Sequence, residues 1–269
     1  GLVATPTWIC GEGTAMRPET MASVNAQECR DEFTWIVTVD NPYPAPDPRN
    51  VLPQYRRIRE AFLQGDWNVL VLVEHDNVLP DAGAVRRLLD TPADVVYAPY
   101  RFRKGGLSIW QYINDTSLGM PLTQHPAELA MARAAGVWRV SGAGFGCTLI
   151  RRRVVEAIPF RPDGLSMYPD IRFAQDCLRA GTVAMANMTV EVGHYTADGE
   201  LLLPFRKGGP MAIYEAVQTV NVMVSGRFIA LETGVTYEFT PDEAEDLMRV
   251  GYVMEVKDSS SGSRDEDEP

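Results

Sequence analysis

The chain has 269 residues, and its 45% hydrophobic content predicts a globular protein with a sizeable core. Its formal net charge of -11 excludes a general electrostatic attraction to nucleic acid or to anionic membranes, although a local basic groove is compatible with it. This length allows one large α/β domain, or one large domain with a small appendage.

The first part of the chain alternates between strand and helix patterns. β-branched apolar runs predict strands, and apolar residues at helical spacing predict helices. The predicted strands are Leu2–Ile9, Phe33–Val39, Asn68–Val73 and Ala93–Pro99. The predicted helices are Glu19–Glu28 after Pro18, Val51–Gln64 before Gly65, and Asp81–Leu89. This order predicts βαβ units and a mostly parallel central sheet with flanking helices.

The middle of the chain is less regular. Its glycine-rich stretch Val140–Ile150 lets the backbone turn sharply into a strand or approach a ligand closely. It is not a dinucleotide fingerprint, because its glycines precede a strand-like segment, and no GK[ST] follows as in a P-loop. The remaining predictions are the helices Glu128–Ala135 and Tyr168–Gly181 and the strand Met185–Val192, which closes on Gly193-His194-Tyr195.

The C-terminal region changes character. After a predicted helix at Pro210–Val224, the pattern predicts a compact β-β-α-β unit, with Thr240 as the N-cap of its helix. Its elements are a hairpin of Arg227–Glu232 and Thr236–Phe239, a helix at Glu243–Val250 and a strand at Tyr252–Val256. We expect a main domain over residues 1–225, a small appendage over 226–256 and a disordered acidic tail over 257–269.

Cysteines and apolar runs bear on the location of the protein. Four cysteines without a CxxC pair exclude zinc-ligand spacing and a dense disulfide framework, so we expect buried free thiols in a reducing cytosol. No apolar run reaches the length of a membrane span, and no secretory signal is recognisable. We therefore expect a cytoplasmic protein without membrane contact, located in the host cytoplasm if a phage encodes it.

Residues Asn68–Pro80 carry most of the functional information. A valine-rich run predicts a strand that is buried on both faces and ends at Glu74-His75-Asp76. Two carboxylates at the carboxyl end of such a strand lie where open α/β sheets bind ligands. Carboxylate oxygens there suit Mg²⁺ or Mn²⁺ bridging a phosphate. The alternative is a solvated strand end without a ligand.

Four landmarks stand in an order that resembles a family. They are Asp40 after the second predicted strand, Glu74-His75-Asp76, the glycine-rich VSGAGFGCTLIRR, and PDIRF…RAG followed by VGHY. Together, over residues 1–200, they resemble a GT-A-fold, family-2-like nucleotide-sugar glycosyltransferase. The resemblance implies a doubly wound Rossmann-like sheet that binds a nucleoside diphosphate sugar and a divalent metal.

The resemblance also assigns metal ligands. Glu74-x-Asp76 matches the family's DxD signature, with Glu in place of the first Asp, and His194 matches a late metal-ligand histidine that some members have. Asp76 is the first choice for direct contact with the metal and His194 the second. Glu74 either binds the metal through water or holds the ribose. For His194, the alternative is a structural histidine at a strand end.

Further residues are candidates for the base and for the donor pocket. Asp170 matches the family's ED pair, with Pro169 where the Glu would stand, and it could take the acceptor's proton; the alternative is a helix N-terminal acid. Candidates for donor binding are Thr5, Pro6, Asp40, Glu74, Gly142 and Gly144. Arg101 and Arg103 could steady phosphate charge.

These residues indicate a metal-dependent, inverting glycosyltransferase that uses Mn²⁺ or Mg²⁺ and a nucleoside diphosphate sugar, with a UDP-sugar as the favoured donor. The acceptor is a glycan, a small molecule or, if a phage is the source, a hydroxymethylated DNA base. One alternative is a nucleotidyltransferase on a similar sheet, although Cys10–Thr14 lacks the basic residues that this class needs. Another alternative is a non-catalytic module that binds a sugar or a nucleotide.

Overall fold

The structure is a computed structural model. It describes residues 1–7, 16–39, 41–44, 47–103, 106–162, 168–196, 198–205, 212–224, 227–239, 244, 247–248 and 252–255. The chain divides into two compact units, Gly1–Phe205 and Arg206–Pro269. Each unit has a hydrophobic core of its own, as expected of separate domains.

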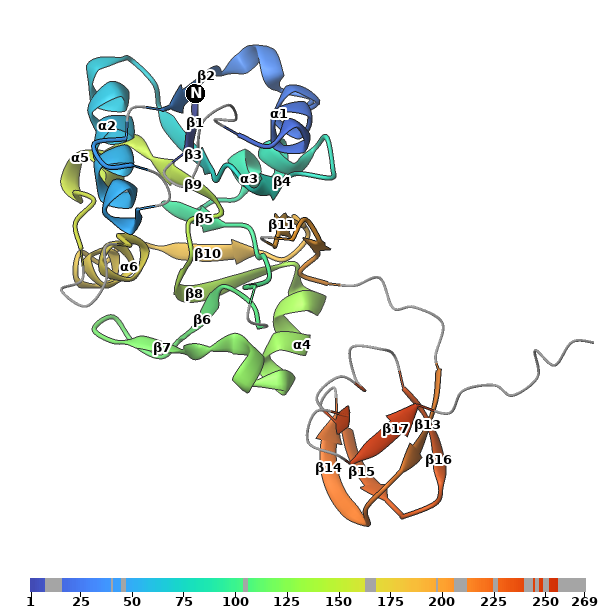
Figure 1. The fold of residues 1–269 in the computed structure, drawn as a ribbon. Coiled ribbons are helices and arrows are strands. Elements are labelled where there is room, and N and C mark those ends of the chain that lie inside the picture. The colour runs from blue at the N-terminus through green and yellow to red at the C-terminus, as the bar shows by residue number, and fades with distance from the viewer. Residues whose placement is uncertain are drawn as a thin grey trace, which may run out of the picture. The chain divides into compact units, whose positions relative to one another are not determined.

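The larger unit is built on a sheet that has nine strands within the described residues, in the order β2-β1-β3-β9-β5-β10-β8-β6-β7 (Figure 1). The strands are β1 Leu2–Pro6, β2 Thr34–Thr38, β3 Val69–Val73, β5 Val95–Tyr97, β6 Ile109–Tyr112, β7 Leu118–Pro121, β8 Val137–Ala143, β9 Cys147–Arg151 and β10 Ala184–Asn187. β6 and β7 lie in the stretch that the sequence left unassigned.

The pairing within this sheet is mixed. β1 pairs in parallel with β2 and β3, and β10 pairs in parallel with β5. β9 lies antiparallel between β3 and β5, and the pairs β10–β8, β8–β6 and β6–β7 are also antiparallel. Strands β2, β1, β3, β5, β10 and β6 therefore share one direction. The predicted α/β fold with a Rossmann-like central sheet and flanking helices is confirmed.

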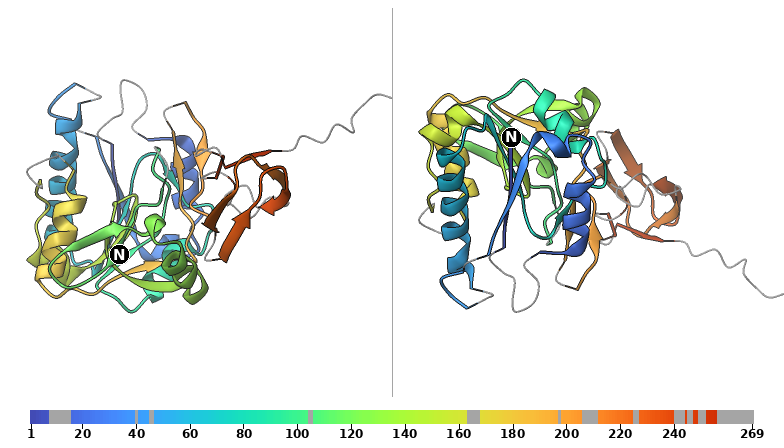
Figure 2. Two further views of the ribbon diagram at one scale, coloured as in Figure 1. Left: turned by 90° about the horizontal axis from the view of Figure 1, so that it is seen from below. Right: turned by 90° about the horizontal axis from the view of Figure 1, so that it is seen from above.

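Helices cover both faces of the sheet. They are α1 Pro18–Asn25, α2 Val51–Gln64, α3 Ala84–Asp90, α4 Pro126–Ala135, α5 Arg152–Ala157 and α6 Asp170–Arg179. Figure 2 shows α2 (blue) and α6 (gold) on one side of the sheet and α1 (dark blue) on the other. Side chains of β3 alternate accordingly: Leu70 and Leu72 join the core beneath α2, whereas Val71 joins the core on the opposite face. This strand is buried on both faces, as its sequence predicted.

Helix α2 has the predicted bounds because its apolar residues follow the helical period. Val51, Tyr55, Ile58 and Phe62 lie on one face and are buried. Each such side chain contributes about 1.5–3 kcal/mol on burial. The helix ends at Gly65, which has an extended backbone with φ −98°. The buried face of α2 packs against the sheet, and the helix contacts β1.

A second, three-stranded sheet forms beside the carboxyl end of β3. Its order is β12-β11-β4, and its strands are β4 Asn77–Val78, β11 Gly193–Tyr195 and β12 Leu201–Leu202. The predicted single strand Met185–Val192 is wrong, because β10 ends at Asn187 and the chain turns there. The Asn187 amide oxygen accepts hydrogen bonds from the backbone and hydroxyl of Thr189, which stabilises the turn. After this turn β11 pairs with β4.

The smaller unit contains β13 Ala212–Ala216, β14 Val220–Val224, β15 Arg227–Leu231, β16 Thr236–Phe239 and β17 Val253–Glu255. The predicted helix Pro210–Val224 is wrong, because β13 and β14 occupy this segment. Valine at every second position of β14 favours a strand. The predicted hairpin is also wrong in its pairing: β15 pairs with β14, and β16 pairs with β13. Residues 206–225 therefore belong to the smaller unit.

Several predictions fall partly or wholly outside the described residues. In the predicted helix Glu243–Val250, the described residues Ala244, Leu247 and Met248 are helical. The acidic tail 257–269, Asp40 and Cys10 lie outside the described residues. The cysteines that are described are free and buried, as predicted: Cys29, Cys147 and Cys177. Among the described helices, none combines the length and apolarity needed to cross a membrane.

Candidate functional site

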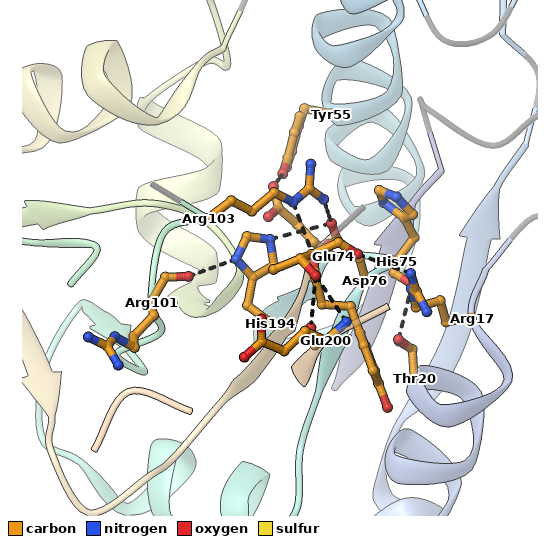
Figure 3. A network of polar contacts seen from close by, with 12 residues as sticks. Arg17, Thr20, Tyr55, Glu74, His75, Asp76, Arg101, Arg103, His194 and Glu200 are labelled. Atoms are coloured by element: carbon orange, nitrogen blue, oxygen red, sulfur yellow. Dashed lines mark hydrogen bonds and ion pairs between the residues drawn. The ribbon is translucent and has the colours of Figure 1, made fainter. Parts of the chain in front are cut away.

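The acidic segment Glu74-His75-Asp76 lies at the carboxyl end of β3 and is held by its neighbours (Figure 3). The backbone N–H of Glu74 donates to the carbonyl of Gly146 at 2.9 Å, in the turn before β9. The carbonyl of His75 accepts from the Thr20 hydroxyl at 3.0 Å and from the Arg17 N–H at 3.2 Å, at the start of α1. These contacts hold the backbone of the segment on two sides.

Glu74 turns toward α2. The Tyr55 hydroxyl donates to Glu74 Oε1 at 2.6 Å. Removal from water, together with the nearby charge of Asp76, raises the pKa of Glu74 to about 7, against the opposing effect of the Tyr55 hydrogen bond. Tyr55 is part of the site that the sequence analysis missed, because a tyrosine on the buried face of a helix is typical of core.

Asp76 faces His194, which β11 carries to this edge. Asp76 Oδ2 and His194 Nε2 lie 3.4 Å apart, and both side chains are at most 10% exposed. His194 Nδ1 lies 2.7 Å from the carbonyl oxygen of Arg101, which can only accept a hydrogen bond, so Nδ1 carries the hydrogen. In the neutral ring, Nε2 therefore presents its lone pair to the carboxylate. The ring of Tyr100 packs edge-on against His194, with centroids 5.2 Å apart.

A carboxylate oxygen and a nitrogen lone pair repel each other unless a cation lies between them. A proton on His194 Nε2 can fill that role. Burial alone lowers the pKa of His194, but the hydrogen bond and charge of Asp76 outweigh it and raise this pKa above its usual value. Burial likewise opposes ionisation of Asp76, but His194 and the nearby positive charges lower its pKa to about 2. These shifts favour the ionised carboxylate of Asp76 and the protonated imidazole of His194.

Two arginines contact residues of this site, and one of them, Arg103, contacts the pair itself. Arg103 donates from a guanidinium nitrogen to Asp76 Oδ2 and from Nε to the carbonyl of Tyr195 at 3.2 Å. Arg17 lies over the ring of Tyr195, 4.4 Å from its centroid, and donates to the carbonyl of Thr196 at 3.2 Å. The guanidinium of Arg101 points away from Asp76 (Figure 3). Arg17 was missed because its position before Pro18 suggests a helix boundary and nothing more.

The residues fit a divalent metal in one specific way. The 3.4 Å between Asp76 Oδ2 and His194 Nε2 suits two ligands that each stand about 2.1 Å from one ion. Within the described part of the chain, no three His, Cys, Asp or Glu side chains are grouped so as to hold a metal. Magnesium is commonly held by one or two protein groups together with substrate phosphates. A metal held by Asp76 and His194 would need further ligands, which substrate phosphates can supply.

Asp170 is the first residue of α6, on the same side of the sheet as α2. Its Oδ1 accepts from the backbone N–H of Ile171 at 2.9 Å. Its negative charge also contributes to raising the pKa of Glu74 and of Tyr55. The structure thus brings Asp170 within electrostatic range of the acidic segment.

Thr5 and Pro6 lie at the end of β1, beside the acidic segment. The parallel register Ala4↔Leu72 places them level with the last residue of β3 and with Glu74. Both are buried, and the Thr5 hydroxyl accepts a hydrogen bond from the Trp35 indole at 3.1 Å. The Thr5 hydroxyl therefore already has a hydrogen-bond partner within the protein.

Gly142 and Gly144 are explained by close packing. A Cβ at Gly142 would lie 2.4 Å from Cβ of Ala174, and a Cβ at Gly144 would lie 2.1 Å from the Tyr100 hydroxyl oxygen. The protein itself fills the side of each glycine where a Cβ would stand. Close packing is thus one reason for glycine at each position, and their role in donor binding stays a prediction.

No protein-family model matches the chain, and no curated protein matches it. Among solved structures, A197 from STIV is similar with 18% identity and a TM-score of 0.49, over 76% of this chain and 93% of that one. A putative glucose-1-phosphate thymidylyltransferase from Bacillus anthracis, in complex with a sucrose, has 13% identity and a TM-score of 0.32, over 60% of this chain and 59% of that one. Likenesses at this level do not transfer an activity.

Proposed function

We propose that the larger unit is a metal-dependent glycosyltransferase of the GT-A type, which moves a sugar from a nucleoside diphosphate sugar to an acceptor hydroxyl with inversion. The observation that carries the proposal is the enclosed pair of Asp76 Oδ2 and His194 Nε2. It lies at the carboxyl end of a central strand, where open α/β sheets bind ligands. The order of motifs in the sequence supports the same interpretation.

Asp76 and His194 are the residues that would hold Mn²⁺ or Mg²⁺, and the ion would neutralise charge that develops on the departing diphosphate. The carbonyl of Arg101 keeps His194 in the tautomer that this role needs. Glu74 stands two residues before Asp76 in the segment and is held by Tyr55, so it is placed to contact the metal through water or to bind the ribose.

Asp170 is the proposed base. An inverting transfer needs one carboxylate to accept the acceptor's proton on the face opposite the leaving group. Asp170 begins α6 and is electrostatically linked to Glu74, which supports a position on the edge of the same site. Thr5, Pro6 and Asp40 would line the nucleoside end of the donor pocket, with a UDP-sugar as the favoured donor.

The acceptor is a glycan, a small molecule or, for a phage protein, a hydroxymethylated DNA base. The net charge of -11 favours the first two, because DNA binding relies on positive surface charge. A phage protein of this kind would act in the host cytoplasm.

The test is ligand-dependent thermal stability. Mn²⁺ together with UDP, GDP or CDP should raise the Tm of the wild-type chain by about 5 °C at a ligand concentration of about 100 times Kd. Asp76→Asn should abolish this shift, because it removes the carboxylate of the cation pair. Asp66→Asn is the matched control: it removes the same charge at an exposed position before β3, and it should keep the shift. No shift with any of the three nucleotides would refute the proposal.

The products of turnover distinguish the alternatives. Release of a free nucleoside diphosphate in the presence of an acceptor supports the glycosyltransferase. Formation of pyrophosphate from a nucleoside triphosphate and a sugar phosphate would instead identify a nucleotidyltransferase. Binding of a nucleotide sugar without release of product would identify a binding module.

A further inference from the structure

Arg103 places a permanent positive charge on the carboxylate oxygen that also faces His194. Its guanidinium donates to Asp76 Oδ2, and its Nε donates to the carbonyl of Tyr195 at 3.2 Å. Asp76 is 8% exposed, whereas the Arg103 side chain is 40% exposed. The guanidinium thus contacts a buried carboxylate, while the Arg103 side chain itself is partly exposed to solvent.

The guanidinium and a divalent metal compete for this oxygen. An arginine guanidinium has no lone pair to offer a metal and keeps its charge in proteins. A metal on Asp76 Oδ2 would stand within a few ångströms of the guanidinium in an enclosed site, where like charges repel strongly. Each of the two cations therefore weakens the binding of the other at this oxygen.

We propose that Arg103 is the built-in counter-ion of Asp76 in the metal-free protein and that it makes metal binding depend on a diphosphate. The inference rests on the proposed function, because the donor's diphosphate is the anion that draws Arg103 away. A diphosphate offers the guanidinium bidentate oxygen acceptors in place of Asp76. The metal and the diphosphate then each raise the affinity of the site for the other, because the diphosphate takes the guanidinium from Asp76 and the metal takes its place. Metal alone binds weakly.

The experiment measures Mn²⁺ binding directly, by the electron paramagnetic resonance signal of free Mn²⁺ at one fixed pH. Arg103→Gln should raise the affinity for Mn²⁺ alone by about tenfold, because it removes the competing charge. It should also reduce the factor by which UDP tightens Mn²⁺ binding. Arg103→Lys, which keeps a charge at this position, should stay closer to the wild type than Arg103→Gln in both measurements.

Arg86→Gln is the matched control. It removes the same charge from a side chain that is also 40% exposed, and this arginine pairs with Glu32, outside the candidate site. Mn²⁺ affinity in this variant should equal that of the wild type. A rise as large as that of Arg103→Gln would mean that net charge alone sets the affinity, which overturns the inference. Circular dichroism and Tm verify that each variant is folded.

The outcomes separate this inference from the proposed function. If the wild type binds Mn²⁺ together with UDP, GDP or CDP but Arg103→Gln leaves the affinity for Mn²⁺ alone unchanged, the inference is wrong and the proposed function stands. If the wild type binds Mn²⁺ with none of these nucleotides, the proposed function itself fails. Asp76→Asn should bind no Mn²⁺ at this site in either the wild-type or the Arg103→Gln background.

Discussion

The glycines of the turn before β9 pack directly against Tyr100. A Cβ at Gly144 would stand 2.1 Å from the Tyr100 hydroxyl oxygen and 3.0 Å from Cζ. We expect Gly144→Ala to lower the free energy of unfolding by about 1–3 kcal/mol, because Tyr100 is buried and cannot move aside freely. Urea denaturation of the wild type and the variant measures the difference.

Two further variants test the cause of that loss. In the double variant Gly144→Ala, Tyr100→Phe, the nearest clashing atom is absent, so the combined loss should be smaller than the sum of the two single losses. Gly181→Ala is the comparison for backbone strain, because Gly181 has φ +69° and a Cβ there would meet no described atom within 4 Å; its cost should be about 1–2 kcal/mol. Strict additivity in the double variant would contradict the steric explanation.

At the residue scale, the sequence predicts site residues at the end of one strand better than it predicts site residues that come together only when separate elements pack. Glu74 and Asp76 could be proposed because an acid at the end of a buried strand has few structural uses. Tyr55 could not, because its hydroxyl finds Glu74 only after α2 has packed on the sheet. The crowding of Gly144 is likewise invisible in the sequence, since its partner Tyr100 lies on a distant segment.

At the element scale, helix α6 carries one buried carboxylate, Asp176, that pairs with three arginines. Asp176 accepts from Arg161 at 2.8 Å and pairs with Arg172 at 3.2 Å and Arg179 at 3.3 Å. Burial alone would raise the pKa of Asp176, but the hydrogen bond from Arg161 and the charges of the three arginines lower it below the ordinary value of 3.8. Charged Asp176 therefore favours the folded state.

This cluster predicts a pH-dependent loss in Asp176→Asn. Because the folded pKa lies below the unfolded one, the stabilisation is present above about pH 4 and is lost as the pH falls through the folded pKa. At pH 7 the variant should be less stable by about 1 kcal/mol, and the difference from the wild type should shrink as the pH falls below 3.8. Urea denaturation across this range measures it, with Glu156→Gln, in an exposed pair, as the control. A difference independent of pH would contradict the charge-based explanation.

The elements that the sequence predicted well are those with one clear period. α2 has its predicted bounds because a single face is apolar along its full length. The helix predicted at Pro210–Val224 was wrong because this segment contains two separate strands, Ala212–Ala216 and Val220–Val224. A window across both strands averages their apolar patterns. The strand predicted at Met185–Val192 failed because the side chain of Asn187 makes a local turn that apolar periodicity does not report.

At the scale of the whole molecule, all described residues of the candidate site belong to Gly1–Phe205. We expect a fragment of residues 1–205 to unfold cooperatively and to keep the Tm shift with Mn²⁺ and nucleotide, because both large cores lie within it. The matched control is the full chain with Leu231→Asp, which disrupts the core of the smaller unit at a fully buried position. Loss of the shift in both proteins would show that the smaller unit is needed for ligand binding.

The alternation of strands and helices predicted the shared direction of the main strands, but it could not predict their order. Nothing in the sequence around Cys147–Arg151 says that this strand enters between β3 and β5, because pairing partners are chosen by the assembled core. The position of His194 was equally hidden, since it depends on the pairing of β11 with β4.

The late insertion of β9 has a consequence for synthesis on the ribosome. β3 and β5 are not neighbours in the sheet, and the strand that joins them is translated after both. A nascent chain that ends before Cys147 therefore exposes two valine-rich edges with unpaired backbone groups, which is the state most open to misassociation. Chaperone dependence during translation should accordingly fall once the chain has been made to Arg151 and this strand has left the exit tunnel.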